Sequence, residues 1–477
     1  MLTIQSNTLI DLATVQAAVH SIIGNKTFDL PEADQHVVGV SGGVDSSAVA
    51  LVLKALHPTQ HFIFVHSDTG VETLGTSEAL ANLELALEEK IFRIKGKKGL
   101  FDVIKDFGSF LPSARARYCT RISKILPFQA FMADRFSPSD RIVSYVGIRA
   151  DESHRKAATH SDGTTNFFPL QSLQMGKREV MRLLDITIGI PSFYRDRSRS
   201  GCSVCCFARR SELIGQWRSD PKAVADAAML EKISEEDLGV LMNVPDPVST
   251  QIGVGRNWLS FPVPGAVDDI PLPFEHIRRV ANKKDRRTSD MFNQDDMVTL
   301  FAAVEYTRFW DGFQWQIANQ NLVTYSKSLG GLKTSLKFFW RHRLDTMELS
   351  LVSNENSLRD DLHVGIFELA IDGAVIDSLD LDGAFTWQSD GTPLLAIRKN
   401  AVIVENVLLA SEIARIQSSS PSINSYDREL VNIVGSKQIL ASGTVLWSGM
   451  FDKPFQNDLV DDDDLSDAPE PCISCSR

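Results

Sequence analysis

The feature of this sequence that most restricts its fold is a glycine-rich loop between an apolar strand and an apolar helix. Residues 36–40 form a short β-branched run, apolar side chains recur at helical spacing over 46–57, and a second apolar run follows at 61–66. This order of strand, helix and strand predicts a βαβ unit. Helical and strand patterns alternate as far as residue 147, so the sequence predicts an α/β fold with a doubly wound parallel sheet.

The loop has the composition of an anion-binding site, reading Ser-Gly-Gly-Val-Asp-Ser. Amide groups at the start of a helix lack an intrahelical acceptor, and the helix dipole favours negative charge there. Gly42 and Gly43 permit close approach of an anion. Ser41 and Ser46 offer hydroxyl groups, and Asp45 is expected to cap the helix or meet a metal ion. The Gly-x-x-x-x-Gly-Lys-Ser/Thr pattern of the usual P-loop is absent from the sequence.

Two carboxylates, Asp68 and Glu72, follow the second apolar run. Ligands of open parallel sheets bind beyond the carboxyl ends of the strands, so both side chains are expected to reach a sugar, a base or a metal ion. The alternative is an ordinary turn after a strand, because an Asp-Gly type turn is common in that position.

The six cysteines are too few for a disulfide scaffold, and their grouping indicates metal or redox chemistry. Cys202 and Cys205 are spaced to share one metal, and only the fold can bring Cys119 beside them. Three or four converging thiolates suit an iron–sulfur cluster or zinc. Cys206 is open to two roles, as a fourth ligand or as a free nucleophile.

Five segments of the chain resemble one protein superfamily. Residues 41–46 are similar to the SGGxDS signature of the PP-loop (N-type) ATP pyrophosphatases. The others resemble segments of the phosphoadenosine phosphosulfate (PAPS) reductase branch: 68–72 (D-T-G-x-E), 117–127 (R-x-C-T-x-x-x-K-x-x-P), 147–153 (G-x-R-x-x-E-S) and 199–207 (G-C-x-x-C). The resemblance covers residues 36–215, a little under half of the chain.

The resemblance implies an adenine nucleotide alpha hydrolase-like fold that binds ATP, which the family cleaves between the α and β phosphates, often with Mg2+. It implies that the loop holds the pyrophosphate end of the nucleotide, and Asp45 is assigned to catalysis as well. The nucleotide contacts expected on this basis are Ser41, Gly42, Gly43, Asp45, Ser46, Asp68, Glu72 and Arg149.

Family members that move sulfur onto nucleic acid tend to hold a [4Fe-4S] cluster. The resemblance therefore implies a cluster bound by Cys119, Cys202 and Cys205, with zinc as the alternative. We expect an enzyme that activates an acceptor with ATP, releases pyrophosphate and lets sulfur displace AMP, with Cys206 as its catalytic thiol. DNA or tRNA is the expected acceptor, and a protein such as a cysteine desulfurase is the expected sulfur donor.

Two other functions stay open. The first is a PAPS (sulfonucleotide) reductase. This hypothesis is weakened because the C-terminal E-C-G-x-H motif of true PAPS reductases is absent from this sequence. The second is a nucleotide-binding or nucleic-acid-binding component of a defence or mobile-element system that binds ATP without turnover.

The chain divides by composition into four parts. Residues 1–215 are expected to form the nucleotide-binding domain with the cysteine cluster, 216–344 a helical, basic and aromatic region, 345–455 a mixed β-containing domain and 456–477 an acidic disordered tail. From residue 345 onward 23 Asp or Glu stand against 8 Lys or Arg, whereas 278–343 holds 12 Lys or Arg against 6 Asp or Glu. The basic segment is expected either to bind nucleic acid or to be a packed helical face.

Smaller features complete the expectations. Short β-like runs occupy 364–371, 394–397 and 402–404, and the tail carries Cys472 and Cys475, which either relay electrons or sulfur or are idle. No run of 18 apolar residues occurs, so we expect no membrane span and a cytoplasmic protein.

Overall fold

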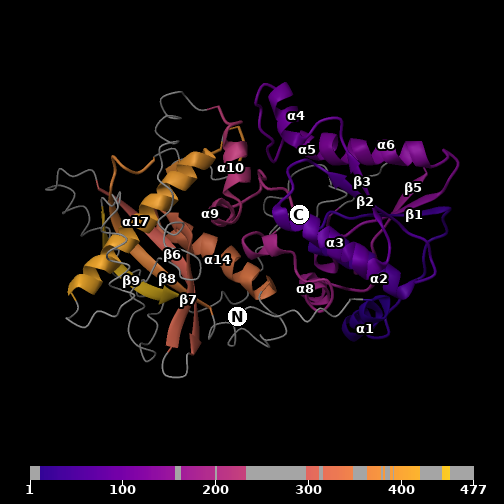
Figure 1. Ribbon diagram of the computed structural model, residues 1–477, viewed down its shortest axis with the longest axis horizontal. Helices are drawn as coiled ribbons and strands as arrows, with labels where there is room; N and C mark the ends of the chain where they lie inside the picture. Colours follow the sequence, from indigo (N-terminus) through magenta and orange to yellow (C-terminus); the bar gives the residue numbers. More distant parts are fainter. Residues whose placement is uncertain are drawn as a thin grey trace.

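A computed structural model gives the fold of most of the chain. It describes residues 11–155, 163–198, 201–232, 297–310, 315–346, 362–377, 380–381, 387–389, 391–418 and 443–451. Figure 1 shows a parallel sheet with its helices in one half of the molecule and an antiparallel sheet in the other.

The first half is built on a five-stranded parallel sheet. Its strands are β1 (Gln35–Gly39), β2 (Ile63–Asp68), β3 (Ile91–Lys95), β4 (Ile142–Tyr145) and β5 (Thr164–Phe167). Their order is β3-β2-β1-β4-β5, and every pairing is parallel. The chain builds outward from β1 to β3, then returns to place β4 on the other side of β1. β1 and β4 therefore lie at a topological switch point, which confirms the doubly wound α/β prediction.

Helices cover both faces of this sheet because successive residues of a buried strand point to opposite sides. Val38 packs in the core formed with α1, α2, α3 and α8, whereas Val37 packs against Phe128 and Met132 of α6 on the other face. The helices of this half are α1 (Leu12–Ile23), α2 (Val44–Leu56), α3 (Leu74–Leu87), α4 (Leu100–Asp106), α5 (Tyr118–Thr120), the π-helical turn η1 (Arg121–Ile125), α6 (Leu126–Arg135), η2 (Ala150–Glu152), α7 (Pro169–Ser172), α8 (Lys177–Asp185) and η3 (Ser192–Arg195).

The second half contains a four-stranded antiparallel sheet in the order β7-β6-β8-β9. Its strands are β6 (Met297–Trp310), β7 (Trp315–Ser326), β8 (Leu362–Asp372) and β9 (Gly443–Phe451). The accompanying helices are α9 (Arg210–Ser219), α10 (Pro221–Ala228), α14 (Leu329–Thr346) and α17 (Leu394–Ser418). In the described part of the chain, no helix combines the length and the apolar character that crossing a membrane requires.

This half differs from the sequence-based expectations in two ways. The segment 216–344, expected to be helical, contributes strands β6 and β7, and these pair in one sheet with β8 and β9 from beyond residue 345. The runs 394–397 and 402–404, expected to be strands, lie inside α17. Between residues 394 and 409 only Arg398 and Lys399 are not buried, and a helix that is buried on nearly every side shows little helical period in its sequence.

The two halves share one apolar core. Val71 and Leu100 of the first half belong to the same buried cluster as Leu300 and Trp387 of the second. In Figure 1, α9, α10 and α14 lie between the two sheets. Polar contacts cross the junction as well, because His342 Nε2 and the Arg343 guanidinium on α14 lie 2.6 Å from the Tyr194 and Arg195 carbonyls of η3.

Candidate active site at the switch point

The glycine-rich loop joins β1 to α2 at the switch point of the parallel sheet. Gly42 has a φ of +74°, which favours glycine, and a β-carbon there would lie 3.0 Å from the Thr76 methyl group. Gly147 follows β4 and packs on the loop, since a β-carbon at Gly147 would lie 3.0 Å from the Asp45 carbonyl carbon. The loops after β1 and β4 thus touch through their backbones at the place where ligands of this fold class bind.

Hydroxyl groups tighten the loop. The Ser46 hydroxyl accepts a hydrogen bond from the Ser41 amide at 3.0 Å and donates to the Gly43 carbonyl at 3.1 Å. The two serine hydroxyls lie 3.0 Å apart, and the Gly43 amide donates to the Ser41 hydroxyl at 3.3 Å. The loop therefore holds its amides and hydroxyls in place at the N-terminus of a 13-residue helix, which is the arrangement that binds an anion.

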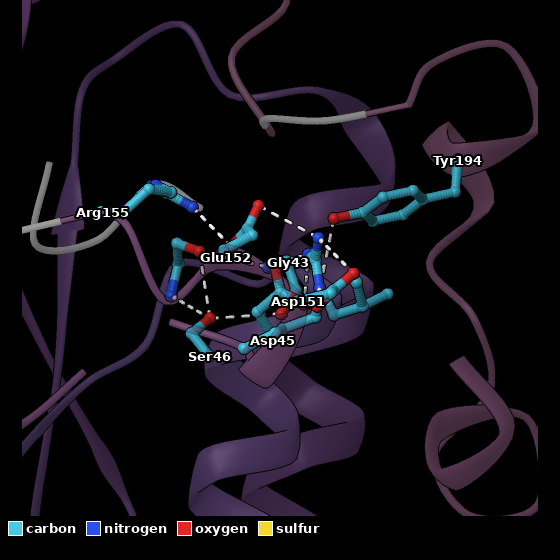
Figure 2. A network of polar contacts seen from close by, with 10 residues as sticks. Gly43, Asp45, Ser46, Asp151, Glu152, Arg155 and Tyr194 are labelled. Atoms are coloured by element: carbon cyan, nitrogen blue, oxygen red, sulfur yellow. Dashed lines mark hydrogen bonds and ion pairs between the residues drawn. The ribbon is translucent and has the colours of Figure 1, made fainter. Parts of the chain in front are cut away.

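A buried network of charges lies beside the loop (Figure 2). Arg149 donates to both carboxylate oxygens of Asp45, at 3.1 and 3.0 Å, and forms ion pairs with Asp151 at 2.9 Å and Glu152 at 3.0 Å. Arg155 pairs with Glu152 at 2.7 Å. Three carboxylates thus surround two guanidinium groups.

The network controls the protonation of its members. Burial disfavours the charge of Arg149, but Asp45, Glu152 and Asp151 together raise its pKa well above the usual value. Burial raises the pKa of Glu152, while Arg149 and Arg155 oppose that shift. The side chain of Asp151 is 44% exposed, so it is the carboxylate of the network that solvent reaches best.

A tyrosine that the sequence analysis did not single out also touches the loop. The amide of Val44, the first residue of α2, donates to the Tyr194 hydroxyl at 3.2 Å. In Figure 2, Tyr194 approaches from the side opposite to Arg155. No motif marks Tyr194 in the sequence, because its segment joins the loop only through the tertiary fold.

The carboxylates after β2 are held by local hydrogen bonds. Asp68 accepts from the Gly70 amide at 2.7 Å and lies 3.7 Å from the Lys95 ammonium group. Glu72 accepts from the Thr69 hydroxyl at 2.7 Å and from the Thr69 amide at 3.3 Å. Both residues lie at the carboxyl end of β2, as expected.

The loop that carries Cys202, Cys205 and Cys206, here called the cysteine loop, is joined to the same edge of the parallel sheet. Glu72 and Cys202 form an antiparallel β-bridge, flanked by hydrogen bonds from the Thr73 amide to the Gly201 carbonyl and from the Ser203 amide to the Val71 carbonyl, each 2.7 Å. The Cys202 sulfur lies 3.9 Å from the Thr69 hydroxyl. Sequence spacing gave no sign of this backbone bridge.

The other thiols of the described chain gather nearby. Burial raises the pKa of Cys119 to about 11, and the neighbouring Cys205 and Cys202 add to the shift. A side-chain hydrogen bond with Cys205, followed by burial, raises the pKa of Cys206 well above its usual value. A protonated, buried thiol is a weak nucleophile, so a catalytic role for Cys206 needs a group that removes its proton.

The cysteines that the structure describes have the donor atoms that a thiophilic metal takes, but their side chains are not arranged around a common metal position. Soft thiolates are the donors that iron–sulfur clusters and zinc take, and a bound cation would relieve the electrostatic cost that these neighbouring thiols share. Across the described residues, however, no group of three or more His, Cys, Asp or Glu side chains is arranged to hold a metal ion.

Several expected contributors cannot be placed. Cys472, Cys475, residues 278–296 of the basic segment 278–343 and the acidic tail lie outside the described residues. Of the predicted nucleotide contacts, the structure brings the residues of the 41–46 loop together with Arg149. It places Asp68 and Glu72 one strand away, at the end of β2, with Cys202 beside Glu72.

Comparisons with known proteins add little to this geometry. No protein-family model matches the chain, and no curated protein sequence matches it. Among solved structures, the chain is similar to a phosphoadenylyl-sulfate (PAPS) reductase from Candida auris crystallised with phosphate. The identity is 13% and the TM-score 0.25, over 36% of this chain and 77% of that one.

Proposed function

We propose that this chain is an adenine-nucleotide-dependent enzyme of the PAPS-reductase-like kind. In this proposal it transfers an adenylyl group from ATP to a nucleic-acid or nucleotide acceptor, which is then sulfurated. The observation that carries the proposal is the β-bridge between Glu72 and Cys202. It joins a cysteine cluster to the edge of the sheet that also holds the anion-binding loop.

The residues of the switch point have separable tasks in this reaction. The loop amides and the hydroxyls of Ser41 and Ser46 bind the β and γ phosphates at the helix N-terminus. Asp45 and Arg149 fix the loop after β4 against the loop 41–46, here called the phosphate loop, because one guanidinium nitrogen, Nη1, donates to both carboxylate oxygens. Asp151, the most exposed carboxylate of the network, is the group we assign to a hydrated Mg2+.

The chemistry proceeds in three steps. An oxygen of the acceptor attacks the α phosphorus of ATP, the bond between the α phosphorus and its bridging oxygen to the β phosphorus breaks, and pyrophosphate leaves. The terminal sulfur of a protein-bound persulfide, such as a cysteine desulfurase supplies, then attacks the activated acceptor atom, forms a bond to it and displaces AMP. A second thiol attacks the inner sulfur of the donor, so that the sulfur–sulfur bond to the acceptor breaks, the acceptor keeps the transferred sulfur as a thiol, and the donor and the second thiol form a disulfide.

We further propose that Cys119, Cys202 and Cys205 hold an iron–sulfur cluster, with zinc as the alternative occupant. When bound, such a group would keep the thiols deprotonated and bind sulfur. Anaerobic purification followed by metal analysis tests this proposal, with Cys202→Ser and Cys205→Ser expected to lose the metal. Iron and zinc both absent from the native protein would contradict it.

The decisive experiment for the proposed function uses α-labelled ATP with Mg2+, alone and with DNA or tRNA. AMP and pyrophosphate are the expected products, formed faster with one nucleic acid. Asp45→Asn is expected to reduce the rate, whereas Asp34→Asn, at an exposed ion pair with Arg141, serves as the matched control and leaves it unchanged.

Two other outcomes would replace the proposal. Intact ATP under every condition, together with sulfite release from PAPS in the presence of a thiol reductant, would make the protein a sulfonucleotide reductase. ATP bound without turnover, and PAPS left intact, would make it a nucleotide-binding component.

A further inference from the structure

Tyr194 is the one aromatic hydroxyl that the described structure places on the phosphate loop. Its oxygen accepts from the Val44 amide at 3.2 Å, and a β-carbon at Gly43 would lie 3.3 Å from it. The side chain is only 2% exposed, so the ring has little freedom to move. The hydroxyl thus occupies the end of α2 to which a phosphate oxygen would bind.

The second half of the molecule holds this tyrosine in place. The ring nitrogen Nε2 of His342 on α14 lies 2.6 Å from the Tyr194 carbonyl, and the Arg343 guanidinium donates to the Arg195 carbonyl at 2.6 Å. Arg343 is itself fixed by Glu305 of β6, at 2.8 and 3.0 Å. Two adjacent residues of α14 therefore anchor two adjacent carbonyls of the segment that carries Tyr194.

The state of His342 suits this anchoring role. Burial is the main reason that its pKa falls to about 3, with Lys177 and Arg343 adding to the shift and Glu212 and the Tyr194 carbonyl opposing it. The imidazole is therefore neutral at physiological pH, and its Nε2 carries the proton that the carbonyl accepts.

We propose that the Tyr194 hydroxyl binds a terminal phosphate of the nucleotide and that α14 positions it through His342. A hydroxyl accepts from an amide and donates to an anion at the same time, so Tyr194 adds a charge-assisted hydrogen bond without leaving Val44. This inference rests on the proposed nucleotide site. It also makes phosphate binding depend on the antiparallel half of the chain.

The test measures binding of three probes to the full-length protein by calorimetry: ATP, inorganic pyrophosphate and adenosine. Tyr194→Phe keeps the ring and removes only the hydroxyl. We expect it to weaken ATP and pyrophosphate by roughly tenfold, the cost of one charge-assisted hydrogen bond, and to leave adenosine unchanged. Equal or tighter binding of ATP, or a matching loss for adenosine, would overturn the inference.

Two substitutions of His342 test the anchoring. His342→Gln can still donate to the Tyr194 carbonyl and is expected to keep most of the ATP affinity, whereas His342→Leu cannot donate and is expected to lose as much as Tyr194→Phe. Equal affinities for the two His342 variants would exclude a positioning role. A wild-type protein that binds no ATP would instead refute the proposed function, which distinguishes the two failures.

Discussion

Arg149 donates hydrogen bonds to both carboxylate oxygens of Asp45, at 3.1 and 3.0 Å, although the two residues lie 104 positions apart in the chain. Both side chains are buried. The contact joins the loop after β4 to the phosphate loop after β1. Arg149 is therefore a structural tie, in addition to the nucleotide contact that we propose for it.

Removing that tie is expected to destabilise the protein. Arg149→Leu would leave the buried carboxylate of Asp45 without its partner, which costs about 3–5 kcal/mol of unfolding free energy. Arg141→Leu is the matched control, because its pairs with Glu32 and Asp34 are exposed and solvent screens them, so we expect little change in the free energy of unfolding. Urea denaturation measures both, and similar losses for the two variants would contradict the expectation.

The close approach of Gly147 to the phosphate loop gives a second prediction. In Gly147→Ala the new methyl group would lie 3.0–3.2 Å from three backbone atoms of Asp45 and Ser46, and backbone cannot turn aside as a side chain can. We expect the loop to shift and ATP affinity to fall at least tenfold.

Gly330→Ala supplies the control for Gly147→Ala. It lies in α14 with nothing within 4 Å of a β-carbon, and alanine there is expected to stabilise the helix by roughly 0.5–1 kcal/mol. Titration of ATP into both variants compares them, and an unchanged affinity in Gly147→Ala would show that the two loops are not coupled.

The sequence predicted the parallel half well because its signals are local. Residues 36–40 and 61–66 each contain a short run of apolar side chains, and the loop between β1 and α2 carries its glycines and serines within one short segment. The use of local signals also explains why the runs 394–397 and 402–404, which lie in α17, were wrongly predicted to be strands. Val402, Ile403 and Val404 are buried on a helix that packs on several sides, and short-range periodicity cannot distinguish that from a strand.

The candidate site was predictable only in its parts. Asp45, Arg149 and Cys202 lie in recognisable segments, but the ion pair and the Glu72–Cys202 bridge join residues more than 100 positions apart. Tyr194 and His342 lie in no motif. Their contact forms where α14 packs against η3. Because α14 begins more than 100 residues after the last recognised segment, local sequence patterns cannot predict this packing.

Stability is expected to depend on pH through Glu231. Burial raises the pKa of this carboxyl to about 8, while the Leu394 amide, which donates to it, opposes the shift. The unfolded chain releases the proton near pH 4.5 and the folded chain keeps it until about pH 8. The contribution of Glu231 to stability therefore falls as pH rises through this window, with a slope of at most ~1.4 kcal/mol per pH unit.

Glu231→Gln isolates this contribution, because an amide oxygen still accepts from Leu394 but does not ionise. Unfolding free energies at pH 5, 6, 7 and 8 give the difference between variant and wild type at each pH. We expect the variant to become progressively more stable relative to the wild type as pH rises. A constant difference would mean that Glu231 ionises normally in the folded state.

Thr76 lies between the phosphate loop and the cysteine loop, and this position allows a compensation test. A β-carbon at Gly201 would lie 2.7 Å from the Thr76 hydroxyl, so Gly201→Ala is expected to push the cysteine loop away and cost about 1–3 kcal/mol of unfolding free energy. Adding Thr76→Ala removes the clash, while the Thr73 amide still binds the Gly201 carbonyl. The double variant should recover about 1 kcal/mol relative to the sum of the single changes. Additive losses in this double-mutant cycle would show that the two loops do not share Thr76 as a contact.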